Sequence, residues 1–128
     1  MKTEDQHHQE LIKGIENQYK EILDSSQQAV YIWLDEECMV CNAKFADLLG
    51  YASATELSQT RGAFLENFVA EPSRAVLANA YNDAMSKKIS STFPLTWKMK
   101  SGGTVLSIVN LIPVAFGDHL FALHFIDL

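Results

Sequence analysis

The chain has 128 residues, 48% of them apolar, and a formal net charge of −6. This length fits one domain with a single hydrophobic core. No apolar run approaches the roughly 18 residues of a membrane span, and the polar start of the chain, residues 1–8, is no signal peptide, so we expect a cytoplasmic protein without membrane contact. Residues 41–128 carry seven acidic and seven basic side chains. Without a basic patch, nucleic acid is not an expected partner.

Residues 9–23 are predicted to form an amphipathic helix. Its apolar residues recur at spacings of three and four, and the stripe is about one and a half heptads long, too short for a stable coiled coil alone. We therefore expect this helix to lie on its own sheet, on a partner chain, or on both. The stripe consists of Leu11, Ile12, Ile15, Tyr19, Ile22 and Leu23.

A strand–turn–strand–helix pattern follows. Ala29–Leu34 is β-branched and aromatic, Asp35–Glu37 makes a turn, and Cys38–Cys41 is a short return strand. Asn42 is placed to cap the next helix with its side-chain oxygen, and Gly50 supplies a left-handed C-cap. Between these two caps, the apolar face is formed by Phe45, Leu48 and Leu49.

The middle of the chain is predicted to be helical. Residues 53–58 and 63–68 form short helical turns, and a longer helix covers residues 71–88, where Pro72 is tolerated in the first turn. The buried stripe of this long helix is predicted to be Val76, Leu77, Ala80, Tyr81, Ala84 and Met85.

Three strands close the chain. Pro94 cannot donate to a ladder, which places the strand at residues 90–100 at a sheet edge. Gly102-Gly103 and Gly117-Asp118 are predicted as two-residue hairpin turns. A two-residue first turn pairs Leu95 with Asn110, and the second turn sets Asn110 opposite Phe125. One face, predicted to be the core side, then carries Leu95, Trp97, Met99, Leu106, Ile108, Asn110, Ile112, Phe121, Leu123 and Phe125, and the other carries Ser107, Val109, Leu111, Pro113, Leu120, Ala122, His124 and Ile126. A one-residue slip of register would swap the two faces.

The order and spacing of these pieces over residues 20–128 resemble a PAS domain. The matching pieces are Ile22–Ser26, the Asn42–Tyr51 segment, Ser101–Gly103, Pro113 and the terminal Ile126–Leu128. The resemblance implies an α+β fold with a five-stranded antiparallel sheet of order 2-1-5-4-3 and helices on one face. Residues 1–23 would be an N-terminal amphipathic helix on the other face, and residues 24–128 the PAS domain.

The resemblance also implies a non-enzymatic module for sensing and signal transduction. Such modules dimerise and act on a fused output domain or a signalling partner protein, and some bind a small organic ligand. No effector sequence follows Leu128, so we expect either a fragment of a larger sensor or a free-standing partner protein.

The chain lacks the residues through which members of the family bind haem or attach a chromophore. Haem-binding members use a histidine on the long helix, and residues 71–88 contain none. Flavin and hydroxycinnamoyl photoreceptors attach through a cysteine in the preceding short helical region, whereas both cysteines here, Cys38 and Cys41, lie on the second strand. Haem and covalent flavin are therefore disfavoured and no cofactor is expected, while a noncovalent flavin or an organic metabolite stays open.

Other reactive groups form no organised site in the sequence. The spacing of Cys38 and Cys41 suits a metal, but no second ligand pair is near, and on a strand the two sulfurs point to opposite faces. His119 is expected to be exposed, and His124 to be a half-buried histidine with a hydrogen-bond partner. No catalytic or metal residue is predicted. The alternative function is a small cone-shaped α+β enzyme that uses His124 or Asp127 in an apolar cavity.

Two sets of residues are predicted to carry function. A ligand pocket between the helices and the core face of the sheet would be lined by Phe45, Phe64, Tyr81, Trp97, Asn110 and Phe125. The second sheet face is too apolar to meet water unaided, which predicts a homodimer interface made with the first helix. That interface would use Leu11, Ile12, Ile15, Tyr19, Ile22, Val109, Leu111, Leu120 and Ile126.

Overall fold

The computed structural model describes residues 4–33, 39–60, 62–116 and 119–128. The predicted turns at Asp35–Glu37 and Gly117-Asp118, together with Cys38, lie outside these residues. The helices are α1 (Glu4–Gln18), α2 (Lys20–Ser25), α3 (Ala43–Leu49), α4 (Ala54–Ser58), α5 (Phe64–Phe68) and α6 (Glu71–Lys87). The strands are β1 (Ala29–Trp33), β2 (Met39–Cys41), β3 (Ser91–Lys98), β4 (Thr104–Phe116) and β5 (His119–Asp127).

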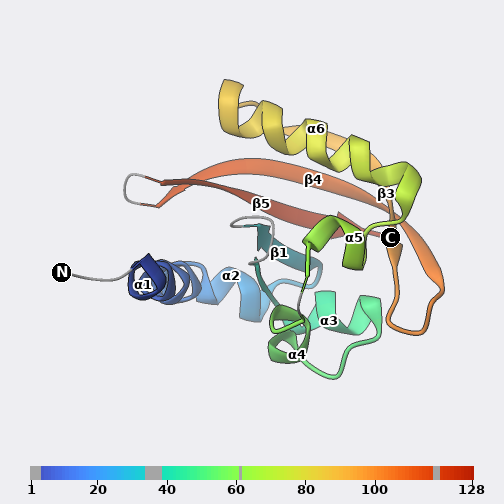
Figure 1. Ribbon diagram of the computed structural model, residues 1–128, viewed down its shortest axis with the longest axis horizontal. Helices are drawn as coiled ribbons and strands as arrows, with labels where there is room; N and C mark the ends of the chain where they lie inside the picture. The colour runs from blue at the N-terminus through green and yellow to red at the C-terminus, as the bar shows by residue number, and fades with distance from the viewer. Residues whose placement is uncertain (1–3, 34–38, 61, 117–118) are drawn as a thin grey trace.

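The strands form one antiparallel sheet of order β2-β1-β5-β4-β3, as predicted. The β3 strand, which contains Pro94, lies at an edge of this sheet. In Figure 1, α6 lies along one side of the β4–β5 hairpin, and α1 lies on its opposite side. The face covered by α3, α5 and α6 is called the inner face below, and the face that α1 and α2 partly cover is called the outer face.

Asn42 joins the start of α3 to the first strand, which confirms its predicted capping role. Its Oδ1 accepts from the backbone N–H of Phe45 (3.1 Å) and from that of Val30 (3.0 Å). Its Nδ2 donates to the carbonyl oxygen of Gln28 (3.0 Å). Gly50 ends α3 in the left-handed region (φ 84°), as expected. The amide therefore holds two elements together besides capping one.

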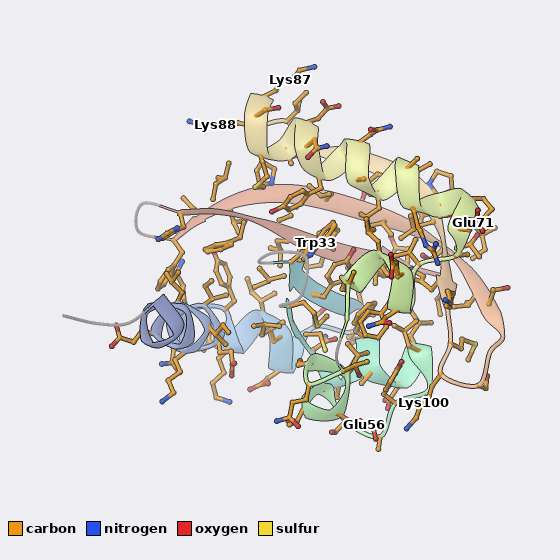
Figure 2. All side chains as sticks on the ribbon, in the orientation of Figure 1. Trp33, Glu56, Glu71, Lys87, Lys88 and Lys100 are labelled. Carbon is orange, nitrogen blue, oxygen red and sulfur yellow. The ribbon has the colours of Figure 1, made fainter. Side chains whose placement is uncertain are left out.

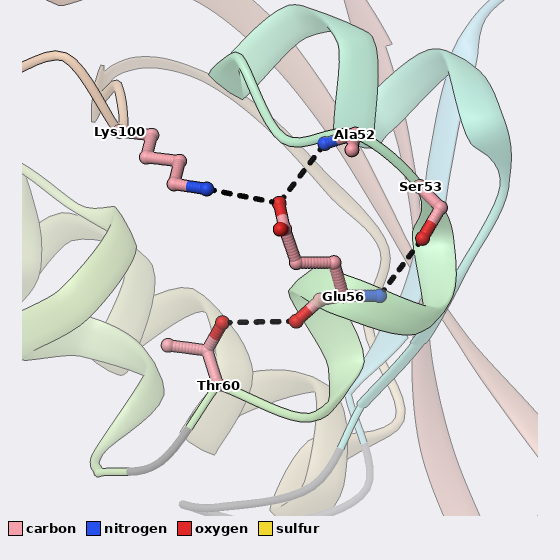
Figure 3. Close-up of polar contacts among 5 residues, drawn as sticks. All are labelled: Ala52, Ser53, Glu56, Thr60 and Lys100. Carbon is pink, nitrogen blue, oxygen red and sulfur yellow. Dashed lines mark hydrogen bonds and ion pairs between the residues drawn. The ribbon is translucent and has the colours of Figure 1, made fainter.

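The α3–α4 turn is tied to the β3–β4 loop through Glu56 (Figure 3). Oε1 of Glu56 accepts from the backbone N–H of Ala52 (2.9 Å) and from Nζ of Lys100 (3.2 Å). Ser53 caps α4 by accepting from the Glu56 backbone N–H (3.0 Å). These two hydrogen bonds lower the pKa of the Glu56 carboxyl, and the bond from the Ala52 backbone contributes more than the one from Lys100. These contacts hold the start of α4 to the β3–β4 loop.

The predicted register of the β3–β4 hairpin is wrong. The last pair is Lys98 with Thr104, so the connection spans residues 99–103 instead of two glycines. Within it, the backbone N–H of Met99 donates to Gly103 O (2.8 Å) and that of Gly102 to Met99 O (3.0 Å), with Gly102 at φ 99°. This longer loop shifts β4 by an odd number of residues relative to β3 and therefore swaps which face of β4 meets the core.

The β4–β5 register is confirmed, with Asn110 opposite Phe125 and Ile108 opposite Asp127. The prediction therefore groups the residues of β4 and β5 correctly into two faces. The group predicted to face outward is, however, the one that faces the core. Ser107, Val109, Leu111, Ala122, His124 and Ile126 are buried on the inner face, beside Leu95 and Trp97 of β3.

The N-terminal helix breaks at Tyr19 into α1 and α2, where a single helix over residues 9–23 was expected. Ile15 is fully buried against the outer face, in a cluster with Val30, Ile32, Val40, Phe121 and Leu123. Because the break rotates the second segment, Leu23 is buried while Ile22 is 38% exposed. Gly14 lets the helix approach the hairpin, since a Cβ there would meet Cζ of Phe116 at 2.4 Å.

The α6 helix runs from Glu71 to the Lys87–Lys88 end (Figure 2). Its buried side includes Leu77 and Ala84, with Ala80, Tyr81 and Met85 partly buried against the same core. Val76, predicted to belong to this stripe, is 40% exposed and faces away from the core.

Candidate functional site

A cluster of aromatic rings fills the space between the inner face and the helices. Tyr31 of β1 is at its centre and stacks on Phe45 of α3, with ring centroids 4.7 Å apart. The rings of Phe64 and Trp97 lie 5.2 and 5.5 Å from Tyr31. Trp33 extends the cluster by packing on Phe64 (5.1 Å) and on Tyr81 of α6 (4.5 Å), in the space beneath α6 that Figure 2 shows.

His124 and Tyr31 form a buried polar pair inside this cluster. They lie opposite each other on β5 and β1, and their rings stack at 4.0 Å with an angle of 9°. Both side chains are fully buried. Among the described residues, the Tyr31 hydroxyl and both ring nitrogens of His124 have no hydrogen-bond partner. The expectation of a half-buried His124 is therefore wrong, because the side chain is fully buried.

Burial sets the ionisation of both groups. It lowers the pKa of His124 to about 3, which the nearby backbone of Ala122 and Tyr31 offsets only in part. It raises the pKa of the Tyr31 hydroxyl well above its usual value of 10.0. At neutral pH both side chains are uncharged, so each offers hydrogen-bond donor and acceptor capacity without a net charge.

The structure brings together only some of the predicted pocket residues. Phe45, Phe64 and Trp97 surround Tyr31, and Tyr81 joins them through Trp33. Asn110 and Phe125 lie on the outer face, because the hairpin register was mispredicted. Asn110 there accepts a hydrogen bond from Oγ1 of Thr92 (2.6 Å) in an exposed position. Sequence reasoning missed Tyr31, although its central place in an apolar strand was a usable signal.

A surface pocket of about 310 Å³ opens beside the aromatic cluster. It is lined by Trp33, Ala63, Phe64, Leu65, Glu66 and Arg74. Nε of Arg74 donates to the carbonyl oxygens of Leu65 (3.2 Å) and Val69 (3.1 Å), so this guanidinium holds the end of α5. Phe64 belongs both to the wall of this pocket and to the rings around Tyr31. Phe64 therefore connects the pocket to Tyr31 of the buried pair.

Trp97 is held in this cluster by a buried polar contact. Its indole N–H donates to Oγ of Ser107 (2.8 Å), and that hydroxyl donates to the carbonyl oxygen of Leu95 (3.2 Å). Ser107 is thus the polar anchor of the inner face on β4.

We expect Ser107→Ala to lower the free energy of unfolding by about 1–3 kcal/mol, since it leaves the indole N–H buried without a partner. Urea unfolding followed by tryptophan fluorescence measures the change. Ser91→Ala is the matched control, because the Ser91 hydroxyl is buried with no partner in the described part of the chain and its removal should cost little. Equal losses in both variants would contradict the role assigned to Ser107.

The described residues contain no group of three His, Cys, Asp or Glu side chains able to hold a metal ion. Cys41 is a buried free thiol whose pKa burial raises to about 12. His119 is exposed, as expected. In the described part of the chain, no helix has the length and apolar character needed to cross a membrane.

The residues predicted for the dimer interface divide between the two faces. Val109, Leu111 and Ile126 are buried in the inner core and are unavailable to a partner, which corrects their assignment to the interface. Leu120 lies on the same side of β5 as Ile126 and is partly exposed. Leu11 and Ile12 are partly buried on α1, while Ile15 is buried against the chain's own sheet. The apolar side chains exposed on the outer face are Leu106 (66%), Ile108 (43%) and Ile112 (37%) of β4.

Comparison with solved structures identifies the fold. The PAS domain of a protein from Colwellia psychrerythraea is similar with a TM-score of 0.67 at 14% identity, over 89% of this chain and 97% of that one. A PAS domain from a two-component sensor histidine kinase gives a TM-score of 0.62 at 16% identity, over 89% and 96%. The PAS domain of the fruit-fly ELK potassium channel gives 0.60 at 16%, over 91% and 96%.

No protein-family model and no curated protein sequence matches the chain. The likeness therefore rests on the arrangement of the helices and strands. It confirms the predicted PAS fold: a five-stranded antiparallel sheet of order 2-1-5-4-3 with helices packed on it.

Proposed function

We propose that this chain is a non-enzymatic sensory module that binds a small organic ligand beneath α6 and passes its state to a partner through the outer sheet face. The observation that carries the proposal is the buried Tyr31–His124 pair with unsatisfied polar atoms, within a PAS fold. Native proteins pair nearly all buried polar groups, so an unpaired set in the interior favours a bound molecule. The fold is shared with a sensor histidine kinase domain and an ion-channel domain, which supports a signalling role.

The ligand proposal is tested by a mass spectrum of the small molecules released when purified protein is denatured. One compound in near-stoichiometric amount is the expected result. A protein that releases nothing, after expression in more than one medium, would contradict ligand binding. Turnover of a substrate that is abolished by His124→Phe would instead favour the enzyme alternative.

We further propose that the chain forms a homodimer through the outer face. The α1 and α2 helices pack on β1, β2, β5 and the end of β4 around Val114 and Phe116. Leu106, Ile108 and Ile112, nearer the start of β4, form an exposed apolar row. Burying three such side chains is worth roughly 1.5–3 kcal/mol each before association costs, enough for a modest dimer. A partner protein or fused output domain would use the same row.

Ile108→Glu should convert a dimer to a monomer, because it places a charge in the centre of this row. We expect the dimer dissociation constant to rise at least tenfold, measured by light scattering over a concentration series. Val76→Glu is the matched control: Val76 is exposed to a similar degree but lies on α6, on the other side of the molecule. A wild-type chain that is monomeric at high micromolar concentration would remove the dimer proposal.

A further inference from the structure

The buried pair of Tyr31 and His124 has a cost that the fold alone does not explain. Three polar atoms with no partner among the described residues lie at positions without solvent exposure. A polar atom that is buried without a partner loses its bonds to water and gains nothing in return, so it destabilises the fold. Phenylalanine would fill either position with nearly the same shape and without this cost. The polar atoms are thus expected to serve a bound molecule.

The chemistry of the pair defines what that molecule presents. A tyrosine hydroxyl donates and accepts, and a neutral imidazole has one donor and one acceptor nitrogen. A complementary ligand needs a hydrogen-bond donor and an acceptor on one edge. The surrounding rings of Phe45, Phe64 and Trp97 favour a flat, aromatic body. A charged ligand is disfavoured, since these neighbours are apolar and would not compensate a buried charge.

Phe64 is the aromatic ring shared by the surface pocket and the cluster around Tyr31. Its ring lies 5.2 Å from Tyr31 and 5.1 Å from Trp33, and Trp33 and Phe64 line the 310 Å³ surface pocket. It belongs to the five-residue helix α5, which follows Gly62 in a positive-φ conformation (φ 103°). Phe64 is therefore in contact with the pocket on the surface and with Tyr31 in the interior.

Resting on the proposed ligand binding, we infer that Tyr31 and His124 are the recognition groups for a neutral, planar heteroaromatic ligand with adjacent donor and acceptor atoms, and that Phe64 closes its entrance. Arg74, which also lines the pocket, donates to main-chain carbonyls at α5 and is not available as a charged partner for the ligand through Nε. Recognition thus lies at the inner end of the site, beyond Phe64.

The test uses two probes of similar size, 2-pyridone and benzene. 2-Pyridone has an N–H donor beside a carbonyl acceptor, and benzene has neither. In Phe64→Ala, which opens a cavity beside the pair, we expect 2-pyridone to bind at least tenfold more tightly than benzene in NMR titrations. Adding Tyr31→Phe and His124→Phe to this variant should reverse the preference, since dry apolar cavities bind benzene.

The variants also separate this inference from the proposed function. Equal affinities of the two probes for Phe64→Ala, or a 2-pyridone preference that survives the Phe substitutions, would overturn the inference. If the intact protein releases a natural compound and Tyr31→Phe/His124→Phe releases the same amount, ligand binding stands and the recognition groups are wrong. If the intact protein releases nothing but the probe preference holds, the inference stands and the proposed natural ligand fails.

Should the triple variant fail to fold, Tyr31→Phe and His124→Phe are each tested singly with Phe64→Ala.

Discussion

Replacing Asn42 by alanine is expected to lower the free energy of unfolding by about 2–4 kcal/mol, because one substitution removes a helix cap and leaves buried backbone groups unpaired. The Asn42 side chain is 5% exposed and bonds the backbone of Val30, Phe45 and Gln28. Alanine satisfies none of these three groups, and water has little access to them. Urea denaturation at neutral pH measures the loss as a lower midpoint at unchanged slope.

Ser53→Ala is the matched control for this prediction. Ser53 caps α4 through one exposed hydrogen bond to the Glu56 backbone (3.0 Å), which Figure 3 shows. Its loss should cost about 1 kcal/mol or less, as for an ordinary cap. Asn42→Asp should fall between the two, because its carboxylate keeps the acceptor for Val30 and Phe45 but cannot donate to Gln28. Equal losses for Asn42→Ala and Ser53→Ala would show that the link to β1 contributes nothing.

The local elements could be predicted from the sequence because local chemistry determines them. Asn42, Gly50 and Pro94 each have a conformational or hydrogen-bonding property that fixes a cap or an edge, and the structure has all three where expected. The register across the β3–β4 loop depends instead on how many residues the loop uses. Gly102-Gly103 resembles a two-residue turn, but the Met99 N–H donates to Gly103 and the Met99 carbonyl accepts from Gly102, which closes a longer loop.

That one difference of register accounts for most of the errors in the predicted site. Alternation along β4 and β5 sorted the residues into two faces correctly, but alternation is symmetric and does not say which face is inner. Asn110 and Phe125 were consequently assigned to the pocket, and Val109, Leu111 and Ile126 to the interface. The helical residues Phe45, Phe64 and Tyr81 were unaffected, because their positions depend on helix periodicity and not on strand register.

Burial of His124 is expected to make the ligand-free protein sensitive to acid. Its pKa is about 3 in the folded protein, mainly through burial, against an ordinary value of 6.5. A proton therefore binds the unfolded chain more readily, and stability falls as the pH drops from about 6.5 towards 3. The free energy of unfolding should fall by about 1.5 kcal/mol between pH 6.5 and 5. This is below the most that one group can contribute, which is about 1.4 kcal/mol for each pH unit.

Urea unfolding at a series of pH values measures this slope, and His124→Phe isolates the contribution of one side chain. Phenylalanine can keep the stack on Tyr31, whose ring lies 4.0 Å away, and it removes the unpaired nitrogens. We expect this variant to be at least as stable as the wild type at pH 7 and clearly more stable at pH 5. His119→Asn is the matched comparison, because it removes one exposed imidazole and leaves the buried His124 in place. The same slope in wild type and His124→Phe would mean that other groups cause the acid sensitivity and that His124 is not buried in its neutral form.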